Sequence, residues 1–284
     1  MRSEKTIISG LLLAMIAVSC TERINIDLDN SYTRLVVDGT ITTETKAHKV
    51  ILSETSSYFY NQPAPMVSGA QVTITDGENT IDLTEGSPGI YSTQPSVHGI
   101  PGHTYSLRII LPVEIGGYTG YTASSLLNPV NPLDSIRLRF RPEFSKEGFW
   151  EVQCYVQDPP SSDFYRFLIS RNQKLITDTL QEWFVTDDRF FNGSYTNGAS
   201  IAELDQSKPE EKLSEGDTIT AEVNNIGKDY ANFIWDAQSE LFGSNPLFSG
   251  PPSNVKGNIS NGAIGFFAAY SVTRSKAITH AIKR

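Results

Sequence analysis

The chain has little cysteine: only Cys20 and Cys154 occur in 284 residues. Two cysteines cannot form the framework of several disulfides that stabilises many small domains, so packing must hold this fold together. Cys154 lies in an alternating stretch, residues 150–156, which is typical of a strand. We therefore predict that Cys154 is a buried structural thiol and not a nucleophile.

Positive charge is also scarce. The sequence has 23 Lys and Arg against 32 Asp and Glu, a formal net charge of −9, and no cluster of basic residues. Such a chain is a poor partner for nucleic acid or for anionic lipid headgroups. We predict no nucleic-acid partner, and attachment to a membrane would have to come from another feature.

Long apolar runs are absent except near the N-terminus, where residues 7–18 are mostly apolar. This run is shorter than the roughly 20 apolar residues of a membrane-spanning helix. Arg2 and Lys5 precede it, and the small or modest side chains of residues 17–19 separate it from Cys20. This order is typical of a lipoprotein signal peptide, in which the cysteine thiol becomes acylated.

We accordingly predict a signal peptide over residues 1–19, lipidation of Cys20 by acyl chains such as palmitate, and a lipidated tether over residues 20–32. An ordinary secretory signal that happens to contain a cysteine is the alternative. On the lipoprotein interpretation, the chain is anchored to a membrane and does not span it.

Recognised catalytic motifs are missing. The sequence contains no Gly-x-Ser-x-Gly, no His-Glu-x-x-His and no phosphate-binding glycine loop. Its four histidines, His48, His98, His103 and His280, lack the close spacing of a zinc site. We predict that the protein is not an enzyme and has no cofactor. A hydrolase whose two carboxylates meet only in space stays open as an alternative.

Asp187, Asp188 and Asn192 are the candidates for a metal site, because Ca²⁺ prefers several oxygen ligands. Their spacing lacks the regular alternation and terminal glutamate of an EF-hand loop. Asp and Asn also favour ordinary turns through local backbone hydrogen bonds. We predict a structural turn without metal, and calcium is the alternative.

What the sequence does contain is a series of short strand patterns separated by Gly, Pro and Asp-Gly turns. No stretch with helical periodicity lies between these strands. For residues 33–126 we therefore predict an antiparallel β-sandwich, immunoglobulin-like or transthyretin-like. Its predicted strands are residues 34–37, 49–52, 70–75, 80–83, 89–92, 105–110 and 118–124.

Two prolines, Pro129 and Pro132, indicate a connector after this first domain, because neither fits inside a central strand. Residues 133–284 predict a second β-rich domain with one helix near residues 228–242, where apolar residues recur at helical spacing. The predicted fold class is therefore mainly β. The strands expected in the second domain are residues 135–140, 149–157, 164–170, 182–186, 217–224 and 263–273.

Tyr58, Phe59 and Tyr60 form an unusual run of three aromatic residues. Neighbouring side chains of a strand point to opposite faces, so the three cannot share one core. Pro63 and Pro65 follow closely and indicate a loop, where exposed aromatic side chains are useful contact residues. We predict a partner or ligand contact here. The alternative is that Tyr58 and Tyr60 pack inward and only Phe59 is exposed.

Several short phrases follow Cys20 in order. They are residues 24–28 (INIDL), 35–39 (LVVDG), 67–72 (VSGAQV), 88–91 (PGIY), 102–107 (GHTYSL), 188–193 (DRFFNG) and 258–267 (NISNGAIGFF). In this order they resemble a family of Bacteroidota outer-membrane lipoproteins known as domain of unknown function 4249, and the resemblance extends over nearly the whole chain after the signal.

Members of that family are typically encoded beside TonB-dependent outer-membrane receptors, and the family supplies no catalytic residues. The resemblance thus implies a lipid-anchored, non-enzymatic accessory protein of such a receptor, which helps to capture or admit a nutrient. An independent surface module that binds glycan or peptide is the alternative. The location implied is the outer membrane, with the cell surface expected and the periplasmic face as the alternative.

Overall fold

The computed structural model of the protein describes residues 33–56, 63–143, 146–242 and 255–280. Thr33–Arg284 form one compact unit. Most of its elements are strands, which confirms the prediction of a mainly β fold with one α-helix among the described residues. The elements are β1 (Leu35–Thr42), β2 (Lys49–Glu54), β3 (Gln71–Thr75), β4 (Thr80–Ser87), β5 (Ile90–Ser92), β6 (Thr104–Ile115), β7 (Tyr118–Leu126), β8 (Ser135–Arg141), β9 (Phe149–Tyr155), β10 (Phe164–Arg171), β11 (Lys174–Leu175), η1 (Leu180–Glu182), β12 (Phe184–Asp187), β13 (Ala199–Asp205), β14 (Thr218–Ile226), α2 (Lys228–Leu241) and β15 (Ile264–Ile278).

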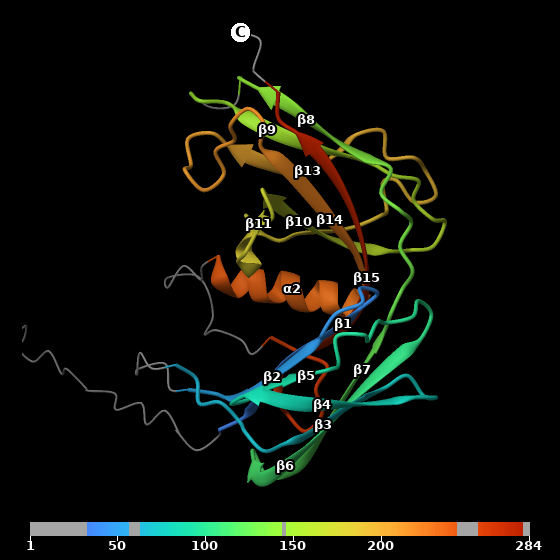
Figure 1. The fold of residues 1–284 in the computed structure, drawn as a ribbon, viewed down its shortest axis with the longest axis vertical. Coiled ribbons are helices and arrows are strands. Elements are labelled where there is room, and N and C mark those ends of the chain that lie inside the picture. The colour runs from blue at the N-terminus through green and yellow to red at the C-terminus, as the bar shows by residue number, and fades with distance from the viewer. Residues whose placement is uncertain (1–32, 57–62, 144–145, 243–254, 281–284) are drawn as a thin grey trace, which may run out of the picture. The chain divides into compact units, whose positions relative to one another are not determined.

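Strands β1 to β7 build the first sandwich (Figure 1). One layer contains β1, β2 and β5, and the other contains β3, β6 and β7. β4 belongs to both, since its first half pairs with β3 and its second half pairs with β5. Alternate side chains fill the space between the layers, as the period of two predicts. This core includes Leu35, Val37, Ile41, Val50, Leu52, Ile74, Leu107, Ile109 and Tyr121.

A second sandwich follows. One of its layers contains β10, β14 and the C-terminal half of β15, with β11 and β12 pairing along the outer edge of β10. The facing layer is the three-stranded sheet β13-β9-β8. Cys154 lies in the core between them at 2% exposure, so its predicted burial is confirmed. Other members of this core are Ile136, Trp150, Val152, Tyr165, Phe167, Ile169, Ile201, Leu204, Ile219 and Val223.

The sequence pattern did not predict β13. This strand pairs with β9 through a bulge between Ser200 and Ala202. Because the bulge inserts a residue, Ile201 and Leu204 both point into the core although they are three positions apart. Strict alternation therefore fails in β13. The strand expected at residues 182–186 begins later, at β12, because η1 occupies the residues just before it.

β15 connects the two sandwiches. Its first half pairs in parallel with β1, from Val36↔Ile264 to Thr42↔Tyr270. Its second half pairs antiparallel with β14, from Asn225↔Ser271 to Thr218↔Ile278. Residues 266–271 are all buried, because the first sandwich covers one face and α2 covers the other. A strand buried on both faces explains the continuous apolar run in this part of the sequence.

The predicted helix is present as α2, which packs against β15 and β10 (Figure 1). Its buried face is formed by Tyr230, Ala231 and Ile234, and the Tyr230 ring lies 4.8 Å from that of Phe266. Leu241 and Phe242 continue the apolar stripe but remain 56% and 69% exposed. Within the described residues, no helix has the length and apolar character needed to cross a membrane.

Arg166 of β10 fixes the helix-covered side of the sheet. Its side chain is 3% exposed and donates to the Asn224 side-chain oxygen at 3.0 and 2.8 Å. The guanidinium carbon lies 4.5 Å from the centre of the Trp183 ring and 4.8 Å from that of Tyr270. Amide hydrogen bonds and aromatic faces thus stabilise a buried cation.

The start of β15 gives a stability prediction. Gly265 has a φ of +98°, and a Cβ there would lie 2.0 Å from the Val37 carbonyl oxygen. We expect Gly265→Ala to lower the free energy of unfolding by roughly 3–5 kcal/mol, because β1 and β15 would have to separate. Urea denaturation measures this.

Gly86→Ala is the matched control, because nothing lies within 4 Å of a Cβ at that position. We expect a change within about 0.5 kcal/mol. A Gly265→Ala variant as stable as the control would contradict the close approach of the two strands.

Candidate functional site

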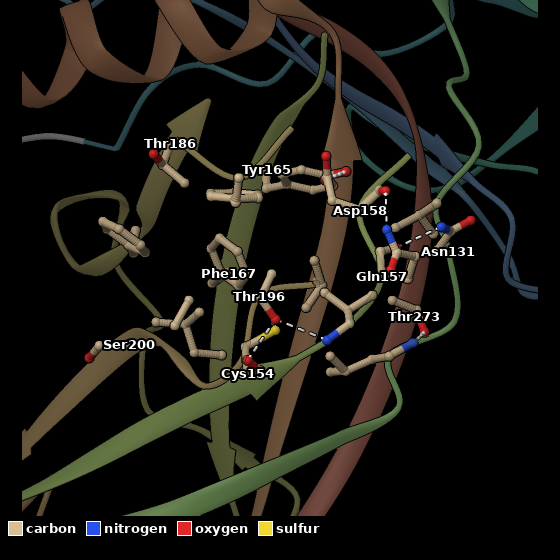
Figure 2. A pocket seen from close by; sticks show the side chains of 18 residues that line it. Asn131, Cys154, Gln157, Asp158, Tyr165, Phe167, Thr186, Thr196, Ser200 and Thr273 are labelled. Carbon is tan, nitrogen blue, oxygen red and sulfur yellow. Dashed lines mark hydrogen bonds between the residues drawn. The ribbon is translucent and has the colours of Figure 1, made fainter. Parts of the chain in front are cut away.

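The second sandwich contains a cavity between its two layers (Figure 2). We call it the inner chamber. It has a volume of about 120 Å³. Residues from β9, β10, β12, β13, β14 and β15 contribute to it, so both layers form its walls. Its walls include Cys154, Tyr165, Phe167, Phe184, Phe191 and Ile201.

Aromatic rings form much of this wall. The Phe167 ring stacks on that of Phe184 with 5.6 Å between centroids, and the Tyr165 ring stacks on that of Phe191 at 6.3 Å. Tyr165 and Phe167 are two residues apart in β10, so they project from the same face of the strand. The chamber therefore offers a flat, carbon-rich surface that suits an apolar group.

A larger and more open hollow, which we call the outer groove, adjoins the chamber. Phe167, Phe184, Ser200 and Ile201 line both. The outer groove has a volume of about 610 Å³ and reaches η1, β13 and the end of α2 at Phe242. Together the chamber and the groove make a cleft between β12 and β13, the edges of the two facing layers.

Four of the five charged side chains that line the cleft belong to the outer groove, and the fifth is Asp158 of the inner chamber. The ionisable residues of the groove are Glu182, Glu203, Lys208 and Glu211, three acidic and one basic, which gives −2 in total. Lys208 already pairs with Glu211 at 2.8 Å. The groove thus presents a negative field, which favours a neutral or cationic ligand over an anion.

Asp158 forms the polar wall of the inner chamber. The Tyr165 hydroxyl donates to its carboxylate at 2.7 Å, and the backbone N–H of Gly193 donates at 3.1 Å. Burial raises the pKa of Asp158, and the nearby carboxylates of Asp188 and Asp163 raise it further. Burial and the bond to Asp158 raise the pKa of Tyr165, so this hydroxyl keeps its proton at neutral pH.

Cys154 lines the inner chamber, where its thiol is buried. Burial raises the pKa of its thiol to about 12. A thiol with that pKa is protonated at neutral pH, and only the thiolate attacks. The predicted structural role is consistent with this environment.

The calcium candidates Asp187 and Asp188 have different hydrogen-bond partners in the structure. The Asp187 carboxylate is held by the Arg189 guanidinium, with Nε–oxygen distances of 2.8 and 2.9 Å. The Asp188 carboxylate instead accepts from the backbone N–H of Asp163 at 2.8 Å. The Asn192 N–H donates to the Asp188 carbonyl in a turn. In the part of the chain that the structure describes, no three His, Cys, Asp or Glu side chains group closely enough to hold a metal ion.

Two sequence-derived candidates lie outside the described residues: Cys20, and the aromatic run Tyr58, Phe59 and Tyr60. Sequence reasoning did not single out Tyr165, Phe167 and Phe184 as site residues. Their strand patterns indicated only that they would pack, and they meet through pairing between β10 and β12.

Comparison with known proteins gives one family. The family model described as "Domain of unknown function (DUF4249)" matches residues 21–276. The comparison with curated proteins gave no match.

Similar solved structures include the FN1–FN3 domains of chicken CNTN1, at 12% identity and a TM-score of 0.27. That match covers 66% of this chain, which spans 59% of the CNTN1 chain. A chain of a cytokine receptor complex matches at 9% identity and a TM-score of 0.25, with coverage of 87% of this chain and 98% of that one.

The bond between Tyr165 and Asp158 gives a prediction that depends on pH. Tyr165→Phe removes a donor to a buried carboxylate, so we expect a loss of about 1–3 kcal/mol in the free energy of unfolding at pH 7. Without this donor, the folded-state pKa of Asp158 rises further above the unfolded value of about 3.9.

A carboxyl with a raised folded-state pKa destabilises the fold above that pKa, and the penalty disappears as pH falls through it. The deficit of Tyr165→Phe should therefore shrink between pH 7 and pH 4 in urea denaturation. Tyr155→Phe is the control, because the Tyr155 hydroxyl makes only a 3.5 Å contact with Gln153. An equal deficit at both pH values would contradict the coupling.

Proposed function

We propose that this chain, which belongs to the family described as "Domain of unknown function (DUF4249)", is a lipid-anchored accessory protein of a TonB-dependent receptor. It acts at the outer membrane, on the cell surface, and is not an enzyme. Its second sandwich captures a nutrient in the cleft and presents it to the receptor. The cleft is the observation that carries the binding role.

The shape of the cleft supports ligand binding. Binding sites for small ligands are typically concave and mostly apolar, with a few fixed polar groups. The inner chamber has this character, and a ligand group that enters it would gain free energy by burying apolar surface.

The chemistry of the walls supports the non-enzymatic part of the proposal. The Cys154 thiol is held protonated by its raised pKa. The Tyr165 hydroxyl and the Asp158 carboxylate are bonded to each other, and Asp158 also accepts from Gly193. These hydrogen bonds fix the polar wall of the chamber.

The anchoring part of the proposal is supported by the signal pattern that ends at Cys20. We expect Cys20→Ala to move the protein from the membrane fraction to the soluble fraction and to abolish metabolic labelling by a palmitate analogue. Cys154→Ala is the matched control, because Cys154 is the second of the two cysteines and is buried. Membrane association that survives Cys20→Ala would contradict lipid anchoring.

The partner can be tested by affinity purification of the lipidated protein from its native outer membrane, followed by mass spectrometry. We expect a TonB-dependent receptor in stoichiometric amount, since a stable contact needs only about 800 Å² on each partner. A control purification uses the Cys20→Ala form, which should recover less receptor. Recovery of the protein alone would favour the independent glycan- or peptide-binding module.

A further inference from the structure

The inner chamber is the part of the cleft whose chemistry is most selective. Most of its polar side chains form hydrogen bonds within the protein. The Thr196 hydroxyl donates to the Cys154 carbonyl at 2.9 Å and accepts from the Val156 N–H at 3.0 Å. The Thr273 hydroxyl oxygen accepts from the Leu133 N–H at 3.0 Å (Figure 2).

A ligand group in the chamber would thus find few free hydrogen-bond partners. A sugar ring carries several hydroxyls, and each of them would lose its bonds to water without replacement. An apolar group has no such penalty and gains from contact with the rings of Tyr165, Phe167 and Phe184. The chamber therefore selects against glycans.

Size narrows the choice further. A dry apolar cavity of about 150 Å³ in another protein is large enough to bind benzene. The inner chamber, at about 120 Å³, is comparable and accepts one small group such as an aromatic ring or a branched aliphatic side chain. The stacked pairs Phe167–Phe184 and Tyr165–Phe191 favour a ring.

The outer groove determines what is attached to that group. It is roughly five times larger than the chamber and carries −2 from its four ionisable side chains. Gln181 and Thr177 add an amide and a hydroxyl to the groove lining, and the Gln181 side-chain oxygen and the Thr177 hydroxyl proton are the parts of these groups suited to bond to a polar chain. A peptide backbone with a lysine or arginine beside the apolar residue matches this combination of size, polarity and charge.

We propose that the cleft binds a neutral or cationic peptide, which inserts one apolar side chain into the inner chamber and places its backbone in the outer groove. This inference rests on the proposed nutrient-capturing function and narrows its cargo to peptides. On this proposal, the chamber does not bind a sugar ring.

The test uses the Cys20→Ala form of the whole chain in isothermal titration calorimetry. The probes are acetyl-Lys-Phe-Ala amide, acetyl-Lys-Asp-Ala amide, which replaces the ring by a charge, and maltotriose. We expect the phenylalanine peptide to bind with a Kd on the order of 0.1 mM. The aspartate peptide and maltotriose should bind at least about tenfold more weakly. Binding of maltotriose without binding of the phenylalanine peptide would overturn the proposal.

Variants locate the binding. Ala199 lines the inner chamber, and Ala199→Phe fills it, so the phenylalanine peptide should lose at least about tenfold in affinity while the Tm stays equal or rises. Phe190→Ala is the matched control, because Phe190 is 91% exposed and outside the lining. Ala199→Leu is a milder second variant if Ala199→Phe does not fold. Unchanged affinity in a folded Ala199 variant would overturn the proposal.

The groove contributes through charge. Glu203→Gln should weaken binding of acetyl-Lys-Phe-Ala amide about two- to fivefold, as expected for loss of an exposed ion pair with the lysine. Binding of the analogue in which alanine replaces this lysine should not change. Receptor recovery with the Ala199→Phe variant separates the two proposals. If the Ala199→Phe variant recovers the receptor normally but no longer binds the peptide, the ligand site is separate from the receptor contact. If no form of the protein, including the one with Ala199 unchanged, binds the peptide while receptor recovery stays normal, only the peptide assignment is overturned.

Discussion

The structure depends on β15, a strand whose first half is buried on both faces. It pairs with β1 in the first sandwich and with β14 in the second, so its backbone is shared by the two layers that carry the cores. Phe267 and Ala269 belong to the first core, while Phe266 and Tyr270 pack beneath α2. Because β1 lies near the start of the described chain and β15 near its end, the pairing is strongly non-local. Such pairing requires that much of the chain be ordered before it forms.

Neighbouring residues of β10 likewise contribute to two different parts of the structure. Tyr165 and Phe167 point into the core that contains the inner chamber, whereas Arg166 points to the opposite face, beneath α2. The buried guanidinium is bonded to Asn224 of β14, so β10, β14 and the helix-covered face are fixed together. The strand that carries Tyr165 and Phe167 is therefore fixed on its opposite face by the hydrogen bonds between Arg166 and Asn224. A wall fixed in advance loses little conformational freedom when a ligand binds.

The sequence predicted the strands wherever burial follows a period of two, as in β1, β6 and β9. It did not predict β13, because the bulge at Ser200 breaks that period. The same distinction applies to the site. Alternation around Cys154 was sufficient to predict its burial, since that property is local to one strand. The cleft was not predictable, because Tyr165, Asp158 and Ile201 are brought together by the packing of separate layers, and one sequence carries no signal for such contacts.

The proposed anchor and the proposed cleft complement each other physically. Lipid anchoring, as proposed, would confine the binding domain near a membrane partner and so raise the effective concentration of one for the other. A chamber that accepts a single small side chain binds weakly on its own, and weak binding is compatible with rapid release. Release matters for a capturing protein, because a cargo held too tightly would not pass to the receptor. A small apolar chamber beside a wide polar groove therefore suits a protein that passes its ligand to a receptor better than one that stores the ligand.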